Sequence, residues 1–135
     1  MYNEDMKNVI AKEIMTSDIL SVEPDISVQD AAVLMEKNNV GSLVVLSPIK
    51  DLLGIFTERD LLKKVIAKKL DPAKTKISEV MTPRVMVAQS TDNAWDLLEV
   101  MQRENFRHLP VVEGRKLVGI VSLKDFFESL LQNRK

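Results

Sequence analysis

The sequence GIFTERD at residues 54–60 returns as GIVSLKD at residues 119–125. In both stretches a glycine follows apolar residues, a hydroxyl side chain stands three positions after the glycine, and an aspartate stands three positions later. The apolar positions that follow are repeated at the same offset of 65 residues: Leu61, Leu62, Val65 and Ile66 are matched by Phe126, Phe127, Leu130 and Leu131. The chain therefore contains two copies of one structural unit.

The first part of each copy is repeated as well, at an offset of 66 residues. The sequence IMT at residues 14–16 returns as VMT at residues 80–82, and a helical pattern of apolar residues recurs at Val28, Ala31, Ala32 and Met35 and at Ala94, Leu97, Leu98 and Met101. A copy of about 60 residues buries only a small core by itself. We therefore expect the copies to share an interface with pseudo-two-fold symmetry, and ligands to bind in the two equivalent crevices between them.

The composition is that of a single globular domain, with 135 residues of which 45% are hydrophobic and 29% charged. The net charge is -1, from 19 basic and 20 acidic side chains that are mixed along the chain, so neither nucleic acid nor a membrane surface is expected as a primary partner. The chain has no cysteine, which excludes disulfides and thiol nucleophiles. Without a signal peptide or an apolar run of about 20 residues, a cytoplasmic location is expected.

Two helices are predicted from the apolar periodicity, over residues 28–37 and 94–103. Ser27 is expected to cap the first helix, and Thr91 to cap the second, because their hydroxyls can accept backbone N–H groups. Two further helices are predicted over residues 58–69 and 123–132, each beginning directly after the hydroxyl residue of the repeated motif. The pair Asp71-Pro72 is expected to stop the helix before it.

Short runs of apolar and β-branched residues predict the strands. Four runs lie between the helices, at residues 43–46, 53–56, 109–112 and 117–121, and shorter strands are expected to open each copy at residues 19–22 and 85–88. Each copy then has the order strand, helix, strand, strand, helix. The fold class is therefore α/β (α+β), with a small mixed sheet in each copy.

The repeated motif has two interpretations, and both stay open at this point. Thr57 with Asp60, and Ser122 with Asp125, have the spacing of a capping box, which is a purely structural role. Alternatively, the first turn of each helix faces a ligand. Free N–H groups there attract phosphate, and a carboxylate accepts hydrogen bonds from adjacent ribose hydroxyls, each worth about 1.5–3 kcal/mol.

The doubled motif, the Met-Thr that opens each copy, and the sequence FRHLPVV at residues 106–112 together resemble the paired CBS domain, also called a Bateman module. The resemblance divides the chain into a polar segment (1–9), a first CBS repeat (10–70), a linker (71–75) and a second CBS repeat (76–135). It implies two β-α-β-β-α repeats packed through their sheets, and often a homodimer. It also implies an adenosine-containing ligand, namely AMP, ADP, ATP or S-adenosylmethionine.

The resemblance also implies roles for individual residues. Asp60 and Asp125 would hold ribose hydroxyls, and Thr57 and Ser122 would contact ribose or phosphate. Adenine would be enclosed by Ile55 and Ile120 with the segments 14–16 and 80–82, which end in Thr16 and Thr82.

Arg107 and His108 would reach phosphates at one of the two sites. A lone histidine is more often structural, but the guanidinium beside it offers a fork of donors that suits phosphate oxygens. The first copy has Gly41 and Ser42 at the matching positions, so the two sites should differ. If Arg107 and His108 serve the crevice of Asp60, that site should prefer the more highly charged ligand.

Motifs for catalysis are missing from the sequence. It has one histidine, no Gly-x-Ser-x-Gly elbow, no Walker loop and no Gly-x-Gly-x-x-Gly fingerprint, so we expect no enzyme activity, no catalytic cofactor and no metal. The leading prediction is a free-standing nucleotide sensor that acts on an unknown partner protein or through its oligomeric state. The alternative is a ligand-free structural or dimerisation module in which the motif residues only cap helices.

Overall fold

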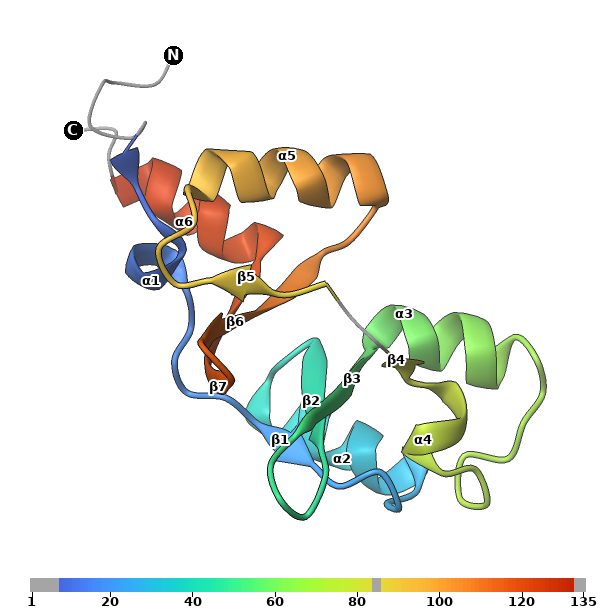
Figure 1. Cartoon of the computed structure of the whole chain (residues 1–135). Helices are drawn as coiled ribbons and strands as arrows, with labels where there is room; N and C mark the ends of the chain where they lie inside the picture. The colour runs from blue at the N-terminus through green and yellow to red at the C-terminus, as the bar shows by residue number, and fades with distance from the viewer. Residues whose placement is uncertain (1–7, 84–85, 133–135) are drawn as a thin grey trace. The chain divides into compact units, whose positions relative to one another are not determined.

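A computed structural model describes residues 8–83 and 86–132, and it divides the chain into two compact units (Figure 1). Unit 1 contains Met1–Ile19 and Met86–Lys135, and unit 2 contains Leu20–Val85. Each unit has its own small sheet, its own helices and its own apolar core. Within the described residues, no helix is long and apolar enough to cross a membrane.

Unit 2 is built on a four-stranded sheet with the order β1-β2-β3-β4. β1 (Ser21–Val22) is parallel to β2 (Ser42–Leu46), while β3 (Leu52–Thr57) is antiparallel to both β2 and β4 (Thr82–Pro83). Its helical segments are α2 (Val28–Asn38), α3 (Glu58–Asp60), η2 (Leu61–Ile66) and α4 (Ile77–Val80).

Unit 1 repeats this arrangement with a three-stranded sheet. β5 (Ala88–Gln89) is parallel to β6 (His108–Glu113), which is antiparallel to β7 (Lys116–Ser122). Thr16 lies where β4 lies in unit 2, because its backbone exchanges two hydrogen bonds of 2.9 Å with Ile120 of β7. The helices of this unit are α1 (Ala11–Ile14), α5 (Ala94–Glu104) and α6 (Leu123–Gln132).

The opening segment of each sequence copy packs in the unit that the other copy forms. The Thr82 segment, from the start of the second copy, pairs with β3, and the Thr16 segment, from the start of the first copy, pairs with β7. Equivalent backbone bonds hold both exchanges: Val28 N–H donates to Thr75 at 2.8 Å, and Ala94 N–H donates to Val9 at 2.8 Å. The compact units therefore do not coincide with the sequence copies.

The predicted order of strands and helices is confirmed, and the predicted apolar stripes lie in the two cores. Unit 2 buries Val28, Ala31 and Met35 of α2 with Leu43, Val45, Phe56, Val65, Ile77 and Val80. Unit 1 buries the matching residues Ala94, Leu97 and Met101 of α5 with Leu109, Val111, Val121 and Phe126. The opening segments add to these cores, Ile77 and Val80 in unit 2 and Ala11 in unit 1, so each core includes residues from both copies.

The predicted cap of the second helix is wrong. Ser27 caps α2 as expected, since its hydroxyl accepts the Asp30 N–H at 3.0 Å. α5 is capped instead by Asn93, whose side-chain oxygen accepts the Asp96 N–H at 3.1 Å. Thr91 stands two residues too early, because a cap must directly precede the first helical residue, which is Ala94.

Two other boundaries differ from the prediction by three residues. The helix expected over residues 58–69 begins as α3 and continues as the π-helix η2, which ends at Ile66. Lys69 then adopts a left-handed conformation (φ 61°) and the Leu70 N–H donates to Val65 at 3.0 Å, so the helix is closed before Asp71-Pro72. The strand expected at residues 85–88 starts at Ala88, with Val85 outside the described residues.

The motif glycines allow the opening segments to approach β3 and β7. A Cβ atom on Gly54 would lie 2.6 Å from the backbone oxygen of Thr82, and one on Gly119 would collide with the sulfur of Met15. Real Cβ atoms do not approach other atoms so closely, so Gly54 is required by its close contact with the backbone of a segment that is distant in sequence. At Gly119 the collision is with a flexible side chain, which can move more easily than backbone.

We expect Gly54→Ala to lower the free energy of unfolding by about 1–3 kcal/mol, because the backbone of the Thr82 segment must move away from the added methyl group. Gly41→Ala is a matched control: its Cβ would also lie 2.6 Å from an oxygen, but that oxygen is the movable end of the exposed Glu58 side chain. The control should cost less than about 0.5 kcal/mol. Urea unfolding measures both, and equal losses would contradict the close-approach explanation.

Asn93→Ala should destabilise the protein by about 1 kcal/mol, because the Asp96 N–H loses its acceptor at the start of α5. Thr91→Ala tests the position that the sequence favoured, and it should change stability by less than about 0.5 kcal/mol. Urea unfolding of the two variants compares them directly. A larger loss for Thr91→Ala would show that the helix is capped at the earlier residue.

Candidate functional site

Asp60 lies in the first turn of the helix that follows β3, and it forms the predicted capping box with Thr57. The Thr57 hydroxyl accepts the Asp60 N–H at 3.2 Å. In return, Oδ2 of Asp60 accepts the Thr57 N–H at 3.0 Å and the Thr57 hydroxyl at 3.2 Å. The structural role of this pair is therefore confirmed.

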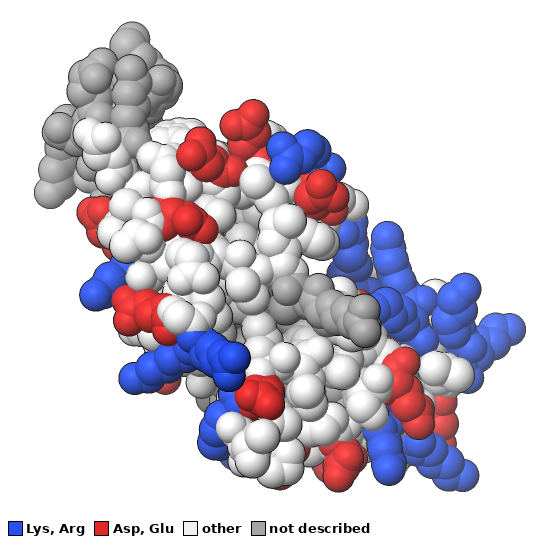
Figure 2. Space-filling view, in the orientation of Figure 1, with Lys and Arg blue, Asp and Glu red and all other residues white. Residues whose placement is uncertain are grey.

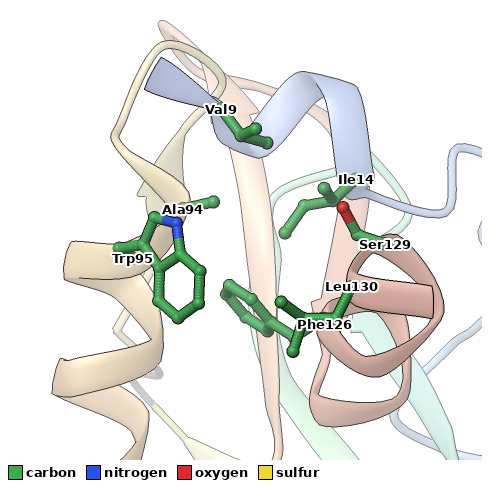
Figure 3. Close-up of a pocket in the computed structure, with 7 residues that line it drawn as sticks. All are labelled: Val9, Ile14, Ala94, Trp95, Phe126, Ser129 and Leu130. Carbon is green, nitrogen blue, oxygen red and sulfur yellow. The ribbon is translucent and has the colours of Figure 1, made fainter. Parts of the chain in front are cut away.

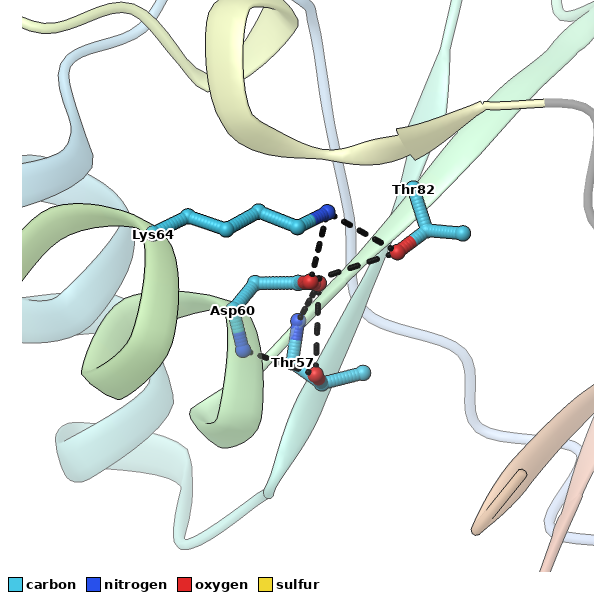
Figure 4. A network of polar contacts seen from close by, with 4 residues as sticks. All are labelled: Thr57, Asp60, Lys64 and Thr82. Carbon is cyan, nitrogen blue, oxygen red and sulfur yellow. Dashed lines mark hydrogen bonds and ion pairs between the residues drawn. The ribbon is translucent and has the colours of Figure 1, made fainter. Parts of the chain in front are cut away.

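The second carboxylate oxygen of Asp60 makes different contacts (Figure 4). Oδ1 accepts a hydrogen bond from Thr82 Oγ1 at 3.2 Å and forms an ion pair with Lys64 Nζ at 3.0 Å. Lys64 Nζ also donates to Thr82 Oγ1 at 3.4 Å. Asp60 is only 5% exposed, so its charge is held in a nearly buried polar network that reaches the opening segment of the other copy.

Unit 1 repeats the arrangement around Asp125. Oδ2 accepts the Ser122 N–H at 2.7 Å and the Ser122 hydroxyl at 3.0 Å, and the Asp125 N–H donates back to Ser122 Oγ at 3.2 Å. Oδ1 accepts from Thr16 Oγ1 at 3.2 Å. One oxygen of each aspartate therefore caps the helix, while the other faces the threonine of a Met-Thr segment.

The predicted site residues fall into two groups. In unit 2, Ile55 is the register partner of Thr82, so Ile55, Thr57, Asp60 and Thr82 lie together. In unit 1, the Ile120 backbone bonds to Thr16, so Ile120, Ser122, Asp125 and Thr16 lie together in the same way. The structure thus brings each predicted isoleucine, hydroxyl, aspartate and threonine into one place in each unit.

Arg107 and His108 lie in unit 1, at the start of β6. His108 is the register partner of Ser122, and the Arg107 carbonyl accepts the Leu123 N–H at 3.1 Å. Within their own unit these residues therefore adjoin the Asp125 group. Their use at Asp60, which belongs to unit 2, stays a prediction.

Lys64 is a candidate that the sequence reasoning missed. The sequence could have identified it, because an acidic and a basic residue four positions apart lie on the same face of a helix. The aligned residue of the second copy is the uncharged Ser129. The two aspartates therefore have different electrostatic surroundings, although their capping and threonine contacts are the same.

A separate hollow lies in unit 1 between α1, α5 and α6 (Figure 3). Its space is about 250 Å³, part of which is open to solvent, and its lining is almost wholly apolar. The Trp95 and Phe126 rings point toward one another across it. Within the described residues, no group of three or more His, Cys, Asp or Glu side chains is placed to hold a metal ion. The polar chemistry is concentrated around Asp60 and Asp125.

Comparisons with known proteins agree with this fold. The CBS domain-containing protein YhcV of Bacillus subtilis is 33% identical to this chain over 122 residues, which cover 90% of this chain and 86% of that protein. An uncharacterized conserved protein from Pyrococcus horikoshii matches with a TM-score of 0.88 and 31% identity over 96% of each chain. A CBS-domain containing protein from Agrobacterium tumefaciens matches with a TM-score of 0.84 and 33% identity, over 90% of this chain and 98% of that one.

The model of the CBS domain family matches twice, at residues 11–67 and 77–132. These matches contain both aspartates, both capping hydroxyls and both Met-Thr segments. The chain therefore belongs to the CBS domain family and carries two CBS domains in tandem.

Proposed function

We propose that this protein is a regulatory module that binds an adenosine nucleotide, AMP, ADP or ATP, at the two aspartate sites. The observation that carries the proposal is that the two oxygens of each aspartate carboxylate make different contacts. Oδ2 caps the helix, whereas Oδ1 faces a threonine that lies 22 residues away at Asp60 and 109 residues away at Asp125. Helix capping does not require that second contact, and it occurs in both units.

The chemistry of each site suits a nucleoside. A carboxylate oxygen can accept the hydroxyls of ribose, and charge-assisted bonds of this kind are about twice as strong as neutral ones. Ile55 and Ile120 stand next to the threonines and offer apolar contacts for a base. S-adenosylmethionine carries the same sugar and base, so it is an alternative ligand for the same residues.

A regulatory role fits the relatives that are enzymes. The inosine-5'-monophosphate dehydrogenase of Methanocaldococcus jannaschii is 31% identical over 93% of this chain, but the match spans only 23% of that enzyme. The shared segment is thus a module carried within a larger protein. A ligand here would act by favouring one arrangement of the chain, and it can do so only if it binds two arrangements unequally.

A homodimer is part of the proposal. Equivalent helix positions of the two units expose large apolar side chains: Leu62 is 62% and Ile66 54% exposed, and Phe127 is 63% and Leu131 62% exposed. Such paired apolar positions suit contact with a second copy. A hexameric CBS-CP12 protein from cyanobacteria, with a TM-score of 0.84 and 28% identity, shows that similar chains assemble. The partner protein and a cytoplasmic location stay predictions of the sequence.

The second candidate function is a ligand-free scaffold. It is favoured by the complete capping boxes, which account for Thr57, Ser122 and one oxygen of each aspartate without any ligand. Binding measurements distinguish it from the nucleotide sensor.

We expect AMP, ATP or S-adenosylmethionine to raise the melting temperature, because a ligand at about 100 times its dissociation constant adds about 2.7 kcal/mol of stability. Asp60→Asn and Asp125→Asn should each weaken binding at one site about ten-fold, or about 1.4 kcal/mol, in calorimetry. Asparagine keeps an oxygen that can accept the capping N–H, so these variants should stay folded.

The control for these variants is Asp30→Asn, which changes an exposed first-turn acid of α2 that lies outside both sites. It should leave nucleotide affinity unchanged. No thermal shift with any of the three ligands would favour the scaffold, and so would unchanged affinity in both site variants.

Arg107→Ala should reduce affinity for ATP more than affinity for adenosine, because an exposed guanidinium contributes through phosphate oxygens. Arg115→Ala is the control, since Arg115 is an exposed arginine in the turn between β6 and β7. Calorimetry with the two ligands gives the comparison. Equal losses of affinity for ATP and adenosine in the Arg107 variant would show that Arg107 does not bind phosphate.

A further inference from the structure

A lysine contacts the Asp60 carboxylate, and the aligned residue beside Asp125 carries no charge. Four contacts surround the Asp60 carboxylate: the Thr57 N–H, the Thr57 hydroxyl, the Thr82 hydroxyl and the Lys64 ammonium. A carboxylate has about four acceptor positions, so these groups occupy it fully. The first three have counterparts at Asp125, but the position of Lys64 is taken there by Ser129, which cannot supply a charge.

The helices that carry these residues differ as well. Lys64 lies in the π-helix η2, where the Ala67 N–H donates to Leu62, whereas α6 is α-helical from Leu123 to Gln132. π-Helical segments are rare and occur often at functional sites. The π-helix η2 thus lies in unit 2, the unit in which a lysine forms an ion pair with the aspartate.

Exposure shows which partner of the ion pair can move. The Asp60 side chain is 7% exposed and is fixed by its capping bonds, while the Lys64 side chain is 43% exposed. Lys64 can therefore turn toward solvent or toward a ligand on its flexible stem. The segment around it is basic: Figure 2 shows Lys and Arg side chains gathered where α3 and η2 lie in Figure 1, and Lys63, Lys68 and Lys69 neighbour Lys64 in sequence.

We propose that Lys64 is a specificity-determining residue that makes the Asp60 site select nucleosides that carry phosphate. Its ammonium occupies an acceptor position of the carboxylate that ribose hydroxyls would use. A neutral nucleoside must displace this cation and gives it no new partner. A nucleotide offers a phosphate oxygen in exchange, so the same displacement costs less. The Asp125 site, with Ser129 in place of the lysine, lacks this source of discrimination. This inference rests on the proposed function.

The test measures AMP and adenosine affinities by calorimetry, one site at a time. Asp125→Asn weakens one site and leaves the Asp60 site for study. In that background, Lys64→Met should strengthen adenosine binding and weaken AMP binding, lowering the preference for AMP about ten-fold. Lys64→Arg should keep the preference because it keeps the cation. Lys63→Met, which removes an exposed neighbouring lysine, is the control and should leave the preference unchanged.

The reciprocal change is made in unit 1. In an Asp60→Asn background, Ser129→Lys places a lysine four residues after Asp125, and it should raise the preference of that site for AMP over adenosine about ten-fold. A rise would support the assignment of selectivity to this helix position. An unchanged preference in Lys64→Met would overturn it.

The outcomes separate this inference from the proposed function. If the Asp125→Asn protein binds AMP and Lys64→Met leaves the preference unchanged, only the role of Lys64 falls. If AMP binds the Asp60→Asn protein but not the Asp125→Asn protein, the nucleotide function stands and the selectivity at Asp60 is overturned. If none of the proteins binds either ligand, both proposals fall.

Discussion

Each unit depends on one aspartate whose two oxygens hold two different parts of the chain together. Through Oδ2, Asp60 and Asp125 fix the start of the helix that follows β3 or β7. Through Oδ1, they hold the threonine of an opening segment that belongs to the other sequence copy. In unit 2, Gly54 makes this possible, because a side chain there would push the backbone of the Thr82 segment away. The glycine, the hydroxyl residue and the aspartate of the motif thus act together to hold the helix start and the opening segment in place.

Because the opening segments are exchanged, the two sequence copies depend on each other for folding. Neither copy completes its unit alone, since the core of each unit includes a residue from the opening segment of the other copy, Ile77 in one and Ala11 in the other. Under the proposed function, a sugar bound at Oδ1 meets the same oxygen that holds this segment. Binding would then act directly on the contact that joins the two copies, which is where a regulatory module needs its ligand to act.

Capping and ligand binding, the two interpretations of the motif, are compatible in this structure because a carboxylate has two oxygens. The capping oxygen orients the carboxylate, and a fixed carboxylate loses less conformational entropy when a ligand binds to its other oxygen. The copies nevertheless differ, since Lys64 adds a cation beside Asp60 where the second copy has Ser129. Duplication has kept the geometry of the site while the charge around it has diverged.

Features that arise from contacts between near neighbours in the chain were predictable from the amino-acid sequence. The apolar periods placed the helices and strands and pointed to Ser27, which directly precedes the first period, as a cap. Spacings of three residues identified both capping boxes, since these contacts form within one turn of chain. Thr91 failed as a cap because three adjacent residues could each serve, and only the first helical turn selects Asn93. The bonds of Thr82 to Asp60 and of Thr16 to Asp125, the exchange of segments and the need for Gly54 were decided by tertiary structure alone, because they join parts of the chain 22 to 109 residues apart, and no local pattern records which distant segment will pass beside a strand.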